Sequence, residues 1–201
     1  MINQRPAPAR SDNNPFVTAW STPFGVPPFG EIRPEHFKPA FARAFAEHEA
    51  EIAEIVKNSS QPTFENTIEP LELSGRALAR VNDVFNLLAG ADTNDALLAL
   101  ERELSPRLAS HWNKIRMNAA LFARIAALYR ARERLELSPE QARVLERYHT
   151  EFWRNGAAHD EESKQKLAAL TERLAALGTA FSQNVLADEQ AYALKIGRAH
   201  V

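Results

Sequence analysis

Apolar residues recur along most of this chain at the three- and four-residue spacing of amphipathic helices. The clearest stripe lies between Pro62 and Asn94 and consists of Phe64, Ile68, Leu71, Leu78, Val81, Phe85 and Leu88. Gly75 occupies the position that this stripe skips, so a small residue interrupts the seam and lets a neighbouring backbone approach. Pro70 removes a backbone donor and predicts a kink or a helix restart at that point.

A first long helix is predicted before this stretch. It starts between Pro34 and Pro39, either of which suits a first helical turn, and runs to about Lys57. Its buried face combines apolar residues with one histidine in the same stripe: Phe37, Phe41, Phe45, His48, Ile52 and Ile55. A loop over 58–62 leads to the second helix, for which Thr63 is the expected N-cap.

Two more helices are predicted in the middle of the chain. One begins near Thr93 or Asn94 and contains Pro106, which predicts a kink. Its apolar side consists of Leu97, Leu100, Leu104, Leu108, Trp112 and Ile115. The next begins after Asn118, a favourable N-cap residue. Its apolar residues are Leu121, Phe122, Ile125, Leu128 and Tyr129.

The last two helices have the clearest start signals. Ser138, Pro139 and Gln141 form a capping box with proline at the first helical position, and predict a helix to about Ala158. Asp160 is the expected cap of the sixth helix. A second seam at heptad spacing follows in that helix, formed by Leu167, Leu170, Leu174, Leu177 and Phe181.

The N-terminal part has no helical pattern. Residues 1–13 are polar and proline-bearing, and are predicted to be disordered. Prolines then alternate with large apolar residues between Asn14 and Ile32, which forbids a helix but predicts an extended arm pinned to the helical body by its aromatics. A proline-rich ligand for an SH3-type partner is the alternative. With no hairpin or βαβ pattern, the predicted fold class is all-α, with about six antiparallel helices behind this arm.

Composition narrows the classes of function. The 201 residues allow one sizeable domain, and a formal net charge of −2 with a pI near 6.3 gives no attraction to nucleic acid or anionic lipid. The absence of cysteine excludes disulfides, thiol catalysis and thiolate metal sites. No apolar run approaches the roughly 20 residues of a membrane span, and no secretory signal is visible. A soluble cytoplasmic protein without a membrane or nucleic-acid partner is predicted.

His48 and Glu49 begin like the H-E-x-x-H motif of zinc peptidases, in which two histidines four residues apart face one metal ion. Ile52 stands where the second histidine is required. One imidazole cannot make that site, so His48 is interpreted as an ordinary histidine near a helix boundary rather than a metal ligand.

Other polar clusters have structural interpretations. Glu146 and His149 form an E-x-x-H pair, but a di-iron bundle needs two such pairs and the chain has one. The acidic run 160–162 suits a helix N-terminus and the basic residues within 130–134 suit a helix C-terminus. We therefore predict no catalytic, cofactor-binding or metal-ligating residue in this chain.

The pattern P-x-F-x-N-T-I-x-x-L-E-x-S-G resembles the N-terminal region of the zinc metallopeptidases that include peptidyl-dipeptidase Dcp, oligopeptidase A and thimet oligopeptidase. It comprises Pro62, Phe64, Asn66, Thr67, Ile68, Leu71, Glu72, Ser74 and Gly75. Further matching pieces follow in order over most of 14–194, at 14–16, 28–29, 32–41, 93–95, 118–122, 146–157 and 181–189. The ordered set is more specific than any one piece.

This resemblance implies a helix-rich peptidase that cleaves short unstructured peptides, often releasing C-terminal dipeptides, inside a channel between two helical lobes. The family's H-E-x-x-H helix and further glutamate ligand lie far downstream, so zinc is implied for the full-length parent and no ligand is transferred to this chain. Residues 14–194 are then expected to be the N-terminal helical domain and a wall of the channel. The missing C-terminal catalytic region is its expected partner.

The end of the chain differs in character from the rest. The resemblance fades at Leu194, and 195–201 resemble a translated sequencing adapter, which predicts a truncated gene with a non-native tail. The alternative is a self-contained helical binding or scaffold module without catalysis. A severed lobe leaves an apolar surface exposed, whereas a complete module buries both seams.

Overall fold

The computed structural model describes residues 14–193, so the tails at 1–13 and 195–201 for which predictions were made lie outside the described residues. Residues 14–193 contain α-helices and no β-strand, which confirms the all-α class. The helices are α1 (Pro34–Lys57), α2 (Glu69–Leu73), α3 (Arg76–Ala91), α4 (Asp95–Arg116), α5 (Ala119–Ala131), α6 (Pro139–Arg154) and α7 (Glu161–Ala191). None of the helices in this part of the chain is long and apolar enough to cross a membrane.

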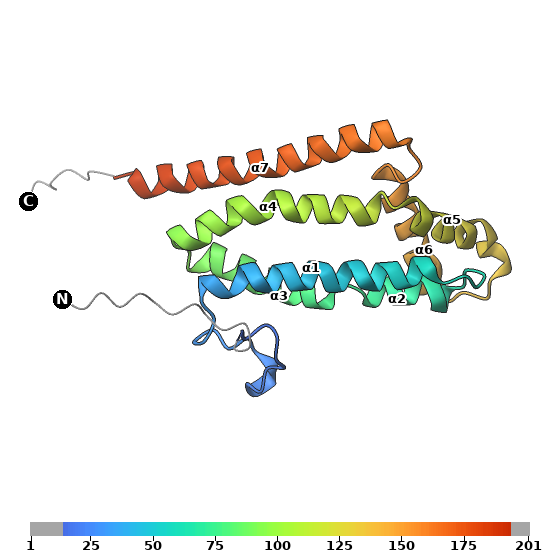
Figure 1. Cartoon of the computed structure of the whole chain (residues 1–201), viewed down its shortest axis with the longest axis horizontal. Helices are drawn as coiled ribbons and strands as arrows, with labels where there is room; N and C mark the ends of the chain where they lie inside the picture. Colours follow the sequence, from blue (N-terminus) through green and yellow to red (C-terminus); the bar gives the residue numbers. More distant parts are fainter. Residues whose placement is uncertain (1–13, 194–201) are drawn as a thin grey trace, which may run out of the picture.

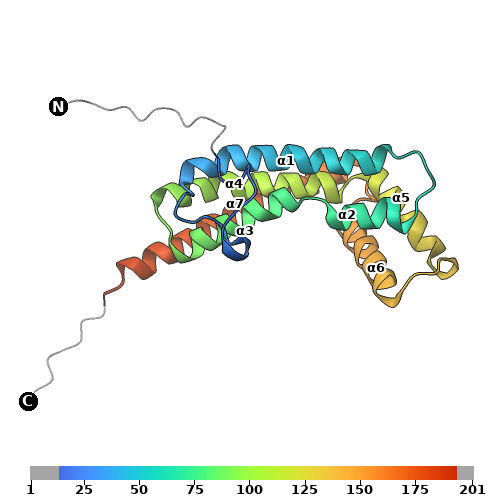
Figure 2. The same cartoon turned by 90° about the horizontal axis from the view of Figure 1, so that it is seen from below.

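The long helices lie side by side along the molecule. Figure 1 shows α4 between α1 and α7, while Figure 2 shows α2 and α3 beside α1. Helices α5 and α6 pack on each other at the end of the bundle where α1 finishes. Helix α7 therefore forms an outer layer that contacts the bundle through α4.

Local capping signals place the helix starts as predicted. The side chains of Thr63, Asn94, Asn118, Ser138 and Asp160 each accept a hydrogen bond from a backbone N–H in the first turn that follows. At Ser138 both bonds of the capping box form. These five predictions succeed because each cap is satisfied by neighbours within three residues and needs no tertiary contact.

The predicted second helix is divided into three pieces. A π-helical turn covers Phe64–Ile68, and α2 restarts with Pro70 in its first turn, as that proline predicts. A further break lies at Gly75, whose φ of 73° ends one helix and precedes α3. The predicted close approach at Gly75 is made by the side chain of His48 and not by a backbone, since an added Cβ would lie 2.8 Å from His48 Cε1.

Helix α6 ends at Arg154, so the predicted end near Ala158 was wrong. Gly156 adopts a φ of 87°, which a glycine tolerates at low cost. The Ala157 N–H donates to the Phe152 carbonyl at 3.0 Å, and the Gly156 N–H donates to the Trp153 carbonyl at 3.2 Å. This Schellman motif satisfies the last carbonyl groups and stops the helix. By contrast, α4 continues through Pro106.

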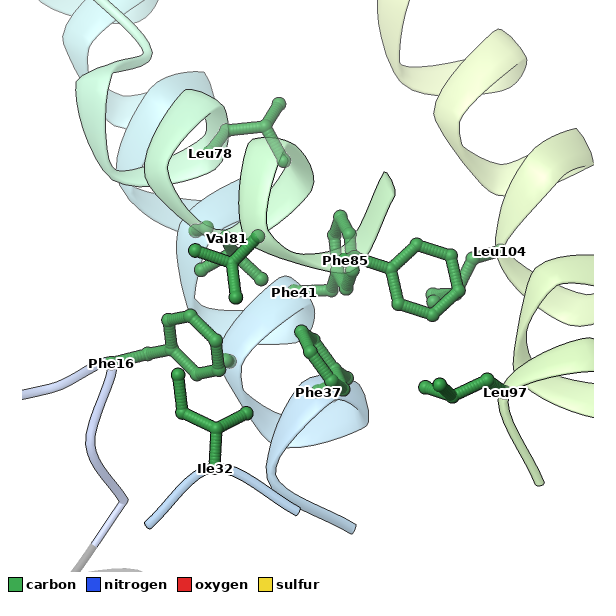
Figure 3. Close-up of a cluster of buried hydrophobic side chains, with 12 residues drawn as sticks. Phe16, Ile32, Phe37, Phe41, Leu78, Val81, Phe85, Leu97 and Leu104 are labelled. Carbon is green, nitrogen blue, oxygen red and sulfur yellow. The ribbon is translucent and has the colours of Figure 1, made fainter. Parts of the chain in front are cut away.

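Two apolar clusters fill the bundle. The first joins the arm to the N-terminal halves of α1 and α4 and to α3, and Figure 3 shows Phe16, Ile32, Phe37, Phe41, Leu78, Val81, Phe85, Leu97 and Leu104 within it. The second joins the other ends of α1 and α4 to α2, α5 and α6, and includes Ile52, Ile55, Ile68, Leu71, Ile115, Leu121, Ile125, Leu128, Leu145 and Phe152. The predicted stripe of 64–88 thus contributes to both cores.

The arm is held on the helical body by its first aromatics, as predicted. Phe16 packs against Phe37 with ring centroids 5.2 Å apart, and the Arg80 guanidinium lies 3.7 Å from the Trp20 ring centroid. The prediction fails further along the arm, because Phe24 is fully exposed with a φ of 59°. Val26 and Phe29 are exposed as well, so apolar contacts hold the arm near its two ends, at Phe16 and Ile32, and not along its middle.

Candidate functional site

The most distinctive polar site lies between α1 and α4, where the two apolar cores meet. His48 follows the α1 residues of the first core and precedes those of the second, and His111 has the same place on α4. Both side chains are buried, and His48 Nδ1 lies 2.9 Å from His111 Nε2. The site is therefore an imidazole pair shared by two long helices.

His48 drew attention in the sequence, but His111 did not. Residue 111 lies seven positions after Leu104 and four before Ile115, so it belongs to the same helical stripe. Trp112 was predicted on that face, and its ring does pack edge-on against His48 at a centroid distance of 5.5 Å. It nevertheless remains 36% exposed, whereas His111 is buried. A buried histidine within an apolar stripe was the available signal.

The histidine pair continues into the break between α2 and α3. His48 Nε2 lies 3.3 Å from Ser74 Oγ, and the Ser74 hydroxyl donates to the Leu71 carbonyl at 2.7 Å. The Gly75 N–H donates to Glu51 Oε2 of α1 at 2.7 Å. Hydrogen bonds at Ser74 and at Gly75, the left-handed residue, thus join the break to α1.

These partners define the protonation of the neutral pair. Because the Ser74 hydroxyl hydrogen is directed to a carbonyl, Ser74 Oγ accepts from His48 Nε2–H. His48 Nδ1 then accepts from His111 Nε2–H, which leaves His111 Nδ1 without a proton or a hydrogen-bond partner. That nitrogen lies 3.7 Å from Glu49 Oε1, a carboxylate that also accepts from Lys114 Nζ at 3.0 Å.

Burial governs the charge of both imidazoles. Desolvation lowers the pKa of His48, although the nearby carboxylates of Glu51 and Glu49 oppose this effect. Desolvation also lowers the pKa of His111, and a charge on His48 would lower it further. Bonding to Lys114 lowers the pKa of Glu49. The pair is therefore neutral at neutral pH, with the ionised Glu49 carboxylate beside it.

The zinc that the sequence resemblance implies does not fit this pair. In the described range of the chain, no three His, Asp or Glu side chains lie close enough together to hold a metal ion. The two facing imidazole nitrogens are hydrogen-bonded to each other, and Ile52 packs in the second apolar core. His48 and Glu49, which resemble the start of the zinc-binding motif, thus contribute to the packing of α1 on α4.

The E-x-x-H pair of α6 is not brought together as a pair of ligands. Glu146 is exposed and accepts from Arg143 Nη1 at 2.7 Å. The His149 ring instead stacks on Tyr129 with centroids 3.9 Å apart and an interplanar angle of 10°. The structural interpretation of this pair agrees with these contacts.

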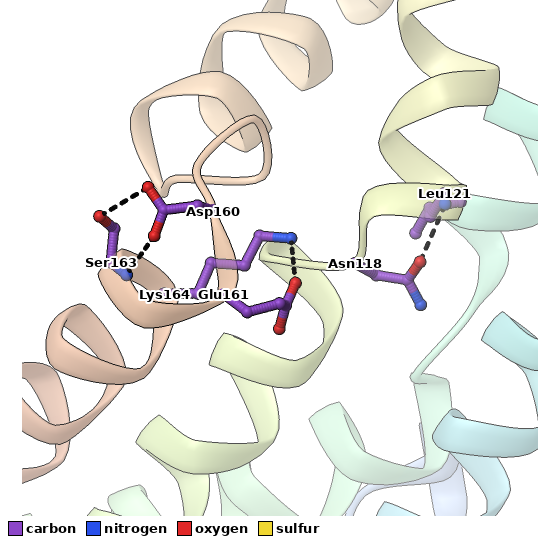
Figure 4. A network of polar contacts seen from close by, with 6 residues as sticks. All are labelled: Asn118, Leu121, Asp160, Glu161, Ser163 and Lys164. Atoms are coloured by element: carbon purple, nitrogen blue, oxygen red, sulfur yellow. Dashed lines mark hydrogen bonds and ion pairs between the residues drawn. The ribbon is translucent and has the colours of Figure 1, made fainter.

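The predicted acidic cluster 160–162 acts in capping. Asp160 accepts from the Ser163 N–H at 2.8 Å, and Glu161 accepts from Lys164 Nζ at 3.1 Å (Figure 4). At the end of α5, Arg130 and Arg132 donate to backbone carbonyls at 3.2 and 2.8 Å. Both clusters therefore have the dipole-related roles that their positions predicted.

A small pocket opens beside His48, between α1, α2, α4 and α6. Its volume is about 150 Å³, and its polar lining comes from His48, Glu72, Ser74, Arg116, Tyr148 and Glu151. Tyr148 donates to Glu72, and burial raises the pKa of this phenol. Ligand pockets for drug-sized molecules start at roughly 300 Å³, so this pocket does not fit a peptide.

Comparison with known proteins identifies relatives of this chain. No family model matches it. It is 40% identical over 174 residues to dipeptidyl carboxypeptidase of Escherichia coli (strain K12), which covers 87% of this chain and 26% of the relative. The Salmonella typhimurium dipeptidyl carboxypeptidase is 37% identical over 187 residues, covering 93% of this chain and 28% of the relative.

A more distant relative is oligopeptidase A of Escherichia coli (strain K12), 25% identical over 173 residues, with 86% of this chain and 25% of the relative covered. The chain spans about a quarter of the length of the curated relatives it matches. These matches confirm the resemblance that the motif at 62–75 indicated. The chain is homologous to the N-terminal part of dipeptidyl carboxypeptidase and oligopeptidase A.

Proposed function

We propose that this chain is the N-terminal part of a zinc-dependent peptidase that hydrolyses short unstructured peptides and releases dipeptides. The observation that carries the proposal is 40% identity to a dipeptidyl carboxypeptidase along 87% of the chain. The part in hand forms a wall of the substrate channel, where it restricts access and fixes substrate length. It contributes to specificity and supplies no group to bond cleavage.

The described residues bear on which part of the parent chain supplies the zinc ligands. They contain no grouped set of three His, Asp or Glu side chains, while the match covers only 26% of the relative. The zinc ligands and the general base would therefore come from the remaining part of the parent chain, which is the partner of this domain. Alone, the 201-residue chain is inactive. The cytoplasmic location predicted from the sequence belongs to the same proposal.

The test compares two proteins in one assay. Cleavage of a quenched short peptide is measured with added zinc, for the 201-residue chain and for a chain extended through the native downstream gene. We expect chelator-sensitive cleavage from the extended chain only. Chelator-sensitive activity in the shorter chain would refute the proposal and make His48 and His111 the first residues to substitute.

A further inference from the structure

An unpartnered apolar stripe runs along the outer helix α7. It consists of Leu170, Leu174, Leu177, Phe181 and Val185, and is called the α7 stripe below. The first four of these side chains are 67%, 69%, 50% and 70% exposed. At 1.5 Å per residue the stripe is about 22 Å long. Single exposed leucines are common on protein surfaces, but a continuous stripe of this length marks a contact surface.

The opposite face of α7 packs on α4 through small and polar groups. Asn113 of α4 donates from Nδ2 to Thr171 Oγ1 at 2.6 Å. Gln183 of α7 donates from Nε2 to the Leu98 carbonyl at 3.0 Å. Because these directional bonds lie near both ends of the contact, they fix the rotation of α7 about its axis. Turning the stripe inward would break them, so its outward orientation belongs to the fold.

The spacing of the stripe indicates what covers it. The steps from Leu170 to Phe181 are four, three and four residues, which is the pattern that receives another helix in knobs-into-holes packing. Figure 1 shows α7 as the outermost layer, with α4 on its inner side. Among residues 14–193, α4 is the helix with which α7 has its main contact.

The length of the relatives indicates where the covering helix comes from. This chain aligns with 26% of a dipeptidyl carboxypeptidase and is homologous to its N-terminal part. Helix α7 is the last described helix, so it leads toward the part of the parent that has no counterpart here. We propose that the α7 stripe is the surface on which that following part packs, through the apolar face of a helix. This inference rests on the proposed function.

The test compares two double variants, each made in two chains. The stripe variant carries Leu174→Glu and Phe181→Glu. The matched control carries Ala169→Glu and Ala180→Glu, which add the same charge to exposed positions of α7 outside the stripe. Both are made in the 201-residue chain and in the chain extended through the native downstream gene. Thermal midpoints are measured by circular dichroism and molar masses by sedimentation.

In the 201-residue chain we expect both variants to be folded and to melt within about 2 °C of the parent, because the substituted side chains already lie in water. In the extended chain we expect the stripe variant to lower the thermal midpoint by about 5 °C or more, since the same carboxylates are buried without partners. The control leaves the midpoint of the extended chain unchanged.

Three results would overturn the inference. Equal midpoints for both variants in the extended chain would mean that nothing covers the stripe there. A 201-residue parent that dimerises and becomes a monomer in the stripe variant, with no effect in the extended chain, would assign the stripe to a second copy. A gene that stops after Val201 would remove the proposed occupant. The melting experiment needs no peptidase activity, so an inactive extended chain with a destabilised stripe variant would refute the proposed function and leave the docking surface intact.

Discussion

Replacing Gly75 with alanine tests the contacts that join α1 to the break between α2 and α3. Gly75 has a φ of 73°, and a Cβ at this position would lie 2.8 Å from His48 Cε1. The imidazole has little room to move away, because its Nδ1 is bonded to His111 at 2.9 Å and its Nε2 faces Ser74 Oγ at 3.3 Å. Both backbone strain and a steric conflict are therefore expected.

The size of the effect can be built from its parts. A left-handed conformation costs a residue with a Cβ about 1–2 kcal/mol. Displacing His48 from its rotamer costs about 0.5–1.5 kcal/mol, and loss of its bond to His111 costs about 0.5–1.5 kcal/mol. We expect the free energy of unfolding to fall by roughly 2–5 kcal/mol. For a chain of this size the thermal midpoint then falls by roughly 4–20 °C.

The assay is urea and thermal unfolding followed by circular dichroism, with Gly90→Ala as the matched control. Gly90 lies in α3 with open space around its Cα and no left-handed backbone, so alanine there should stabilise the protein by about 0.5–1 kcal/mol. Adding His48→Ala to the Gly75→Ala variant removes the steric conflict but keeps the strain. Equal midpoints for Gly75→Ala and Gly90→Ala would refute the reasoning, as would a double-mutant cycle without coupling.

Two further predictions concern buried polar groups. Burial lowers the pKa of His48 and His111 below the unfolded value near 6.5, so the unfolded state binds more protons than the folded state as the pH decreases. The free energy of unfolding should therefore be highest above about pH 6.5 and fall as the pH decreases toward the lowered pKa values. Urea unfolding at several pH values should show a weaker dependence of this free energy on pH when both histidines are replaced by leucine. Arg124 is buried and donates to the Asn58 carbonyl at 2.6 Å and to Asn66 Oδ1 at 2.8 Å. In urea unfolding, Arg124→Ala should lower the free energy of unfolding by about 2–3 kcal/mol. The control Arg134→Ala, on the surface, should lower it by less than about 0.5 kcal/mol.

The features that the sequence predicted correctly are those with local causes. The starts of α4, α5, α6 and α7 depend on a capping side chain and backbone donors within three residues, so the letters alone are informative. The end of α6 depends on the positive φ of Gly156. The sequence does not show which glycines adopt a positive φ. The predicted helix therefore extended too far.

The histidine pair shows a different limit. His48 was judged by whether its own helix supplied a second histidine at the metal-binding spacing, which it does not. Its actual partner is 63 residues away on α4, so no local spacing connects the two. Only the helical register of α4 could have placed residue 111 inward, and Trp112 competed for the same face with a larger apolar side chain.

Helix α7 shows that an apolar pattern predicts which residues share a helix face, but not whether that face is buried. The heptad spacing correctly identified which residues share a face, but the pattern is the same whether that face meets the bundle or solvent. Its orientation depends on polar contacts such as Asn113 with Thr171 and Gln183 with Leu98, whose partners come from another helix. A helix that turns its hydrogen-bonding face inward and its leucines outward gains little hydrophobic stabilisation from this bundle. Such an arrangement is expected of a part whose apolar face is matched to a larger chain, and not of a module that buries both of its seams.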